Sequence, residues 1–80
     1  MIKCVTTLGL GYIGLPTSAL IANNGLIVNG IDISQKVVDT INAGKIHIVE
    51  PDLDLAVENA VKNGFLKAFT TPELADAYLI

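Results

Sequence analysis

The chain has 80 residues and a net charge of −3, which leaves room for one domain and excludes a two-domain enzyme within this stretch. It contains five lysines and no arginine, so no basic patch indicates nucleic acid, and we expect no nucleic-acid partner. One cysteine builds no disulfide framework, and no apolar run reaches the roughly 18 residues of a membrane span. The sequence therefore predicts a cytoplasmic protein with no membrane partner.

The first predicted unit is a strand, a glycine turn and a helix. Residues 2–8 predict a central strand, although Thr6 and Thr7 make it more polar than a buried parallel strand usually is. Three glycines follow at the spacing G-x-G-x-x-G, and a helix begins at about Ile13. We expect this helix to end at Gly25, which can take the left-handed conformation of a C-terminal cap.

Residues 26–33, LIVNGIDI, allow two interpretations. The pair Asn29-Gly30 between apolar runs is a strong hairpin signal. Each arm of that hairpin would have only about three residues, however, and so short a hairpin is marginally stable. We therefore favour a single buried strand with Asp32 at its carboxyl end.

Two further helices are predicted after this strand. Ser34 can cap a helix over residues 35–42, and Gly44 can end it. Pro51 suits the first position of a third helix, because the missing N–H of proline has no helical partner there. That helix ends at Gly64.

The last part of the chain predicts a strand from Phe65, a short helical turn near Pro72 and a strand over residues 77–80. Strands and helices that alternate with short connections favour a parallel sheet wound right-handedly. The predicted fold class is α/β, a Rossmann-like parallel sheet with helices on both faces. It is incomplete and corresponds to the first half of a doubly wound domain.

Gly9, Gly11 and Gly14 form the candidate functional motif. It directly follows a predicted strand and opens a predicted helix. The acidic residue Asp32 ends the next strand, close to the separation of about 20 residues that dinucleotide-binding units show. The first glycine permits a tight turn, the second lets a pyrophosphate approach the backbone, and the third lets helix and strand pack closely. A purely structural glycine turn is the alternative.

Asp32 favours NAD over NADP as the cofactor. Its carboxylate can accept hydrogen bonds from the adenosine ribose and would repel a 2′-phosphate. The chain contains no arginine that could hold such a phosphate. The alternative is that Asp32 only ends a strand before the cap of the next helix.

No residue pattern predicts catalysis or a metal site. Cys4 lies within the first strand with no base beside it in sequence, which is typical of a small buried hydrophobe. His47 alternates with apolar residues and has no second histidine as a metal partner. The acidic residues Glu50, Asp52 and Asp54 are explained by the helix start that they occupy. We therefore expect no catalytic residue and no metal ligand in this stretch.

Several segments together resemble the N-terminal part of the nucleotide-sugar dehydrogenases, the family of the UDP-glucose and GDP-mannose dehydrogenases. These segments are GLGYIGLPT, GIDIS, INAGKIHIVEPDL and GFLKAFTTPELADAYLI, and the resemblance covers essentially the whole chain. The segment IHIVEPDL is more similar to the corresponding segment of the members that act on UDP-N-acetyl-D-mannosamine than to that of the UDP-glucose enzymes. One departure is that Thr6 and Thr7 replace the more apolar pair usual before the glycines.

The resemblance implies an NAD-dependent oxidation of the C6 alcohol of a UDP-sugar to a carboxylate. Two NAD molecules each take up one hydride, with a cysteine-bound thioester between the two transfers. The implied substrate is UDP-N-acetyl-D-mannosamine, and its product is a precursor of bacterial surface polysaccharide. A UDP-glucose 6-dehydrogenase or another UDP-hexosamine dehydrogenase is the alternative within the family.

The resemblance also assigns residues. Gly9, Gly11, Tyr12, Ile13 and Gly14 match the pyrophosphate turn. Asp32 matches the acidic residue that binds the ribose. The catalytic cysteine, lysine and asparagine of the family lie downstream, so no residue here matches them.

Family members are several times longer than this chain. The resemblance therefore implies that residues 1–80 are the N-terminal part of an NAD-binding Rossmann domain, with the substrate and catalytic domain absent. A UDP-sugar would then bind only in the full-length protein. The strand that begins near Tyr78 would lack its neighbours in this stretch, and the apolar sheet edge left open predicts association or poor solubility. We also expect a homo-oligomer. The alternative from another functional class is a stand-alone nucleotide-binding module that catalyses no reaction.

Overall fold

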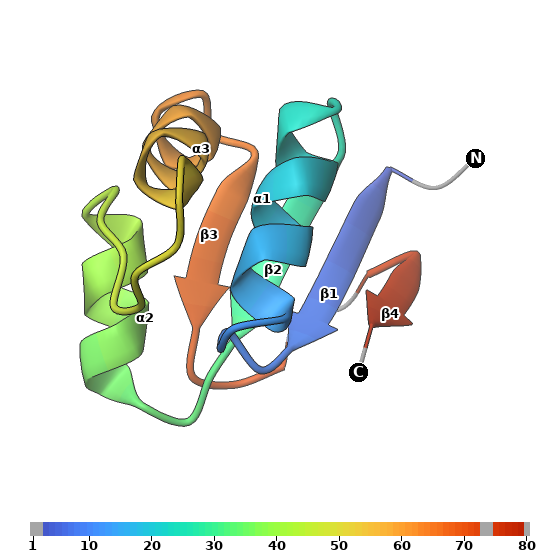
Figure 1. Cartoon of the computed structure of the whole chain (residues 1–80). Helices are drawn as coiled ribbons and strands as arrows, with labels where there is room; N and C mark the ends of the chain where they lie inside the picture. Colours follow the sequence, from blue (N-terminus) through green and yellow to red (C-terminus); the bar gives the residue numbers. More distant parts are fainter. Residues whose placement is uncertain (1–2, 73–74, 80) are drawn as a thin grey trace.

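The computed structural model describes residues 3–72 and 75–79, which form seven helices and strands. The four strands make one parallel sheet in the order β3-β2-β1-β4 (Figure 1). The elements are β1 (Cys4–Leu8), α1 (Gly14–Asn23), β2 (Ile27–Ile31), α2 (Gln35–Asn42), α3 (Leu53–Lys62), β3 (Leu66–Phe69) and β4 (Ala77–Leu79).

The strand order places β1 between β2 and β4. The chain moves from β1 to β2 to β3 in one direction and then returns to the far side of β1 (Figure 1). The connections on the two sides of β1 therefore run in opposite directions, which makes the carboxyl end of β1 a topological switch point. Open α/β sheets bind ligands in the crevice at such a point.

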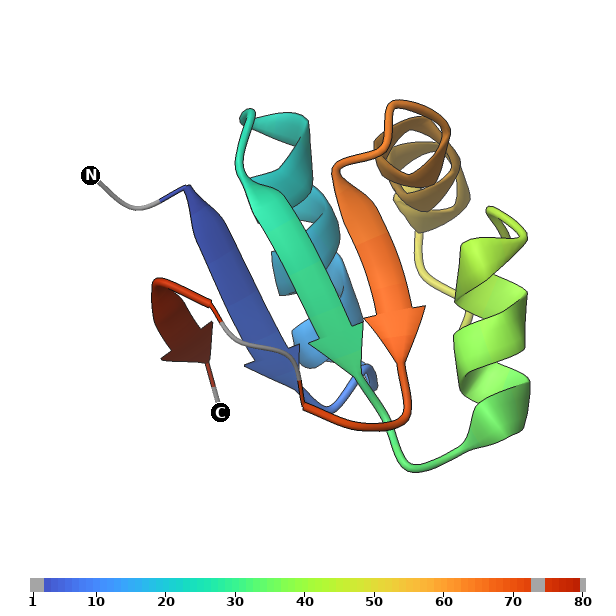
Figure 2. The same cartoon turned by 180° about the vertical axis from the view of Figure 1, so that it is seen from behind.

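All three helices of the described chain contribute to one hydrophobic core. Their buried residues form a single cluster with Val28 and Leu66, which are paired in register and so face the same side of the sheet. Figure 2, the view from behind, shows the strands with no described helix over them. The α/β class and the parallel sheet are confirmed. The helices expected on both faces lie on one face here, because successive right-handed crossovers in one direction place their helices together.

Residues 26–33 form one strand and no hairpin. Strand β2 pairs with β1 on one side and with β3 on the other. A Cβ atom at Gly30 would meet the side chain of Leu10, so this glycine marks a close approach of another segment and not a turn.

The helices and strands begin and end close to the predicted residues, except near Pro51 and Pro72. The Ser34 hydroxyl accepts a hydrogen bond from the Val37 N–H at 3.3 Å and caps α2 as predicted. Helix α3 begins two residues after Pro51, because Asp52 adopts a left-handed φ of 64°. Of the helical turn predicted near Pro72, residues 70–72 form no helix and the next two lie outside the described residues. The predicted strand ends at residues 2 and 80 also lie outside them.

Candidate functional site at the carboxyl end of β1

The glycine turn connects β1 directly to α1. Gly9 has a φ of 95°, a conformation that glycine adopts at no steric cost. Its N–H donates to the Ile31 carbonyl at 2.8 Å, which ties the start of the turn to β2. A Cβ atom at Gly14 would overlap the Gly9 carbonyl group. Both glycines are therefore required by the fold itself, whether or not a ligand binds.

Gly11 differs from the other glycines of the chain. Its backbone conformation is not left-handed, and a Cβ atom there would meet no heavy atom within 4 Å. Each of the other six glycines has either a positive φ or a neighbour within 3 Å of the added atom. The fold alone does not explain a glycine at residue 11, whereas a ligand that must approach the backbone does explain it.

Leu10 anchors the turn to the sheet. Its side chain is completely buried against Gly30. Its N–H donates to Asp32 Oδ2 at 3.1 Å, while Asp32 Oδ1 accepts the Ser34 N–H at 3.0 Å. The sequence predicted Asp32 at the carboxyl end of the second strand, and the structure places it directly after β2 with its carboxylate in contact with the turn. Each carboxylate oxygen has a further lone pair, so the group can still accept bonds from a ligand.

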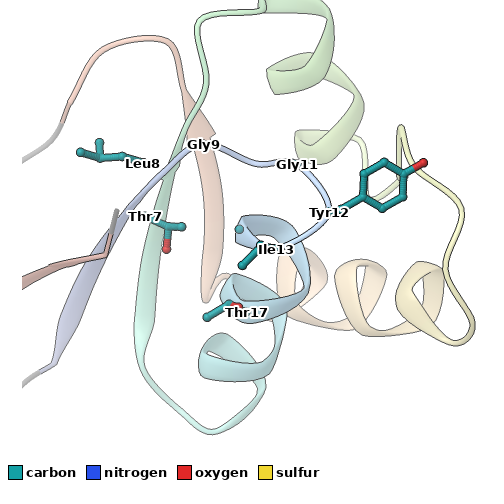
Figure 3. Close-up of a pocket in the computed structure, with 8 residues that line it drawn as sticks. Thr7, Leu8, Gly9, Gly11, Tyr12, Ile13 and Thr17 are labelled. Carbon is teal, nitrogen blue, oxygen red and sulfur yellow. The ribbon is translucent and has the colours of Figure 1, made fainter.

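Two hollows open on either side of Gly9. One is lined by Leu8, Gly9, Ile31, Asp32 and Ile33. The other has a volume of about 560 Å³, within the range of small-molecule sites. Figure 3 shows this larger hollow, referred to below as the turn pocket. Its lining consists of Thr7, Leu8, Gly9, Gly11, Tyr12, Ile13, Gly14 and Thr17.

The start of α1 presents unused hydrogen-bond donors at the turn pocket. The backbone N–H groups of Gly11, Tyr12 and Ile13 have no acceptor among the residues that the structure describes. The side chains of Tyr12 and Ile13 are 69% and 83% exposed, so they do not cover these groups as part of a packed core. Free N–H groups and the helix dipole favour an anion at this position.

Thr7 and Thr17 line the turn pocket, although the sequence did not identify them as site residues. Thr7 comes from the end of β1 and Thr17 from the first turns of α1. The available signal was the polarity of Thr6 and Thr7, which are both buried in a central strand.

The remaining candidates stay apart from the site. Cys4 accepts a weak hydrogen bond from the Asn29 side chain at 3.3 Å, and His47 is exposed. No group of histidine, cysteine and acidic side chains in residues 3–72 and 75–79 could hold a metal ion. Within the same residues, no helix has the length and hydropathy to cross a membrane.

Comparisons with known proteins agree with this geometry. The chain is 59% identical over 76 residues to the UDP-N-acetyl-D-mannosamine dehydrogenase of Escherichia coli K12, which covers 95% of this chain and 18% of that protein. It is 56% identical over 78 residues to the NDP-N-acetyl-D-galactosaminuronic acid dehydrogenase of Ralstonia nicotianae, covering 98% and 18% of the two chains. The UDP-N-acetyl-mannosamine dehydrogenase of Staphylococcus aureus superposes with a TM-score of 0.90 at 45% identity, covering 94% and 18%.

The chain thus spans about a fifth of the length of these relatives. Residues 3–80 match the sequence model of the NAD-binding domain of the UDP-glucose/GDP-mannose dehydrogenases. The parallel sheet, the glycine turn at its switch point and this match together show that the chain belongs to the UDP-glucose/GDP-mannose dehydrogenase family.

Proposed function

We propose that Gly9, Gly11 and Gly14, together with the N–H groups of Tyr12 and Ile13, hold the pyrophosphate of NAD. The free N–H groups at the start of α1 donate to the phosphate oxygens, and the helix dipole favours their charge. Asp32 accepts hydrogen bonds from the adenosine ribose in the smaller hollow. Because a carboxylate repels a 2′-phosphate, the site selects NAD over NADP.

The observation that supports this proposal most directly is the glycine at residue 11. The fold requires the two flanking glycines and makes no demand at residue 11. A side chain there would project into open space beside the unused N–H donors of the turn. A phosphate group that must reach those donors needs this space, which accounts for a glycine.

For the whole protein we propose an NAD-dependent oxidation of a UDP-sugar at its C6 alcohol to a carboxylate. NAD, when bound, supplies the hydride acceptor, and two NAD molecules are consumed for each sugar. The substrate proposed is UDP-N-acetyl-D-mannosamine, which the names of several relatives support. An N-acetylgalactosamine nucleotide is the second candidate, because a relative of similar identity carries a name of that kind. The product would enter bacterial surface polysaccharide synthesis.

In this proposal residues 1–80 form the N-terminal part of the NAD-binding domain, and the catalytic residues lie elsewhere in the protein. The chain itself binds and orients the cofactor. Cytoplasmic localisation and assembly as a homo-oligomer remain predictions. Sedimentation of the full-length protein tests the second of these, and a monodisperse monomer would contradict it.

Two glycine variants of the full-length protein test whether the turn binds NAD. We expect Gly11→Ala to weaken NAD binding at least tenfold in calorimetric titration, about 1.4 kcal/mol, with an unchanged unfolding temperature. Gly25→Ala is the matched control, because its φ of 93° makes alanine unfavourable far from the turn. It should lower the unfolding temperature and leave the dissociation constant for NAD unchanged. Undiminished NAD binding by a folded Gly11→Ala protein would refute the proposed site.

A further inference from the structure

Thr7 carries the one buried side-chain oxygen or nitrogen that lacks a hydrogen-bond partner in the described part of the chain. The residue is 3% exposed and is one of the residues that line the turn pocket. Figure 3 shows its side chain on the same side of β1 as Ile13 and Thr17, while Leu8 points the opposite way. The Thr7 side chain therefore lies on the side of β1 that the turn pocket occupies.

A buried hydroxyl without a partner is unfavourable, because water would have satisfied it in the unfolded chain. Valine has nearly the same shape as threonine and suits a buried strand at least as well. The methyl group of Thr7 already packs beneath Gly14, 3.6 Å from the position of a Cβ atom there. Packing thus explains a β-branched residue, whereas the buried hydroxyl calls for a partner outside the described residues.

The two hollows beside Gly9 indicate what that partner is, on the basis of the proposed function. Asp32 lies in the hollow on the β2 side, where the adenosine ribose would bind. With the pyrophosphate at the start of α1, the other half of the dinucleotide must leave over the turn pocket, which Thr7 and Thr17 line. Phosphate and ribose oxygens of that half are suitable acceptors and donors for a hydroxyl.

We propose that the Thr7 hydroxyl hydrogen-bonds the nicotinamide-side half of NAD, at its phosphate or ribose oxygens. Thr7 is then a residue whose side chain is unfavourable in the free protein and favourable in the complex. This assignment distinguishes Thr7 from the glycines, which act through the backbone alone.

The test uses the full-length protein with the variants Thr7→Val and Thr7→Ser. Thr7→Val removes the hydroxyl and keeps the shape, so the unfolding temperature of the NAD-free protein should rise by about 2–4 °C. The dissociation constants for NAD and ADP-ribose should rise about five- to tenfold, as expected for one lost hydrogen bond. AMP, which contains only the adenosine half, should bind with an unchanged constant. Thr7→Ser keeps the hydroxyl and should bind all three ligands like the wild type.

Each other outcome overturns the proposal. An unfolding temperature that stays level or falls in Thr7→Val would show that the hydroxyl has a partner within the protein. Unchanged binding of NAD by that variant would exclude a contact with the cofactor. An equal loss for AMP and ADP-ribose would mean that Thr7 only shapes the turn. A wild-type protein that binds no NAD would instead refute the proposed function, and the Thr7 assignment with it.

Discussion

The variant Asp32→Asn tests whether one carboxylate both supports the glycine turn and binds the cofactor. In the structure Asp32 accepts the N–H groups of Leu10 and Ser34 at 3.1 and 3.0 Å, one at each oxygen. Asparagine has a single side-chain oxygen and no charge. The substitution therefore removes one of these bonds and weakens the other.

The size of the effect follows from these two bonds. A hydrogen bond to a charged group contributes about 1.5–3 kcal/mol. Asp32 is only half-buried, so water compensates part of the loss, and we expect the lower end, about 1.5 kcal/mol. That value corresponds to a roughly tenfold increase in local opening of the turn.

Amide hydrogen exchange in the NAD-free protein measures this opening directly. Exchange at Leu10 and Ser34 should be about tenfold faster in Asp32→Asn. The dissociation constant for NAD should rise tenfold or more, because a charge-assisted bond to the ribose is lost. Preference for NAD over NADP should decrease, since the negative charge that repels the 2′-phosphate is gone.

Asp39→Asn is the matched control for this variant. The Asp39 carboxylate accepts a bond from the Gln35 side chain on the exposed surface of α2, away from the turn. We expect no change in either measurement. If exchange at Leu10 and Ser34 is the same in Asp32→Asn and wild type, the support role is wrong. If NAD affinity is the same, the ribose assignment is wrong.

Two further substitutions test the packing that positions the site. Leu10→Ala removes a fully buried side chain that packs against Gly30. In denaturant titration this substitution should lower the free energy of unfolding by about 2–5 kcal/mol. A loss below about 1 kcal/mol would show that Leu10 does not anchor the turn. Asn42→Ala removes two hydrogen bonds that the Asn42 amide makes with the Ala68 N–H and carbonyl group, at 2.8 and 3.0 Å. Ala68 lies in β3, which is an edge strand of the described sheet, so these bonds satisfy backbone groups that have no further strand to pair with. Exchange at the Ala68 amide should accelerate about tenfold in Asn42→Ala. Asn63→Ala, which removes only an exposed side-chain bond, should leave that exchange unchanged. Equal exchange in both variants would show that Asn42 does not protect the β3 edge.

Local sequence patterns predicted the helices and strands, because the interactions that begin and end these elements are formed by residues close together in the sequence. The left-handed conformation of Gly25 and the hydroxyl of Ser34 set a helix end and a helix start through contacts within a few residues. The start of α3 was missed near Pro51, because the left-handed conformation of Asp52 has no sequence signal comparable to a glycine.

The sequence by itself determined the parallel α/β class, the glycine motif and the acidic residue that follows it, because each depends on residue type and short spacing. Only the tertiary structure decided which glycines the fold requires, since crowding at Gly14 and open space at Gly11 depend on neighbours brought together by folding. It also decided that Asp32 contacts the Leu10 N–H and that the Thr7 hydroxyl is buried without a partner in the described chain. Those facts depend on the order of the strands and on the side of the sheet that each side chain faces, which spacing along the chain does not specify.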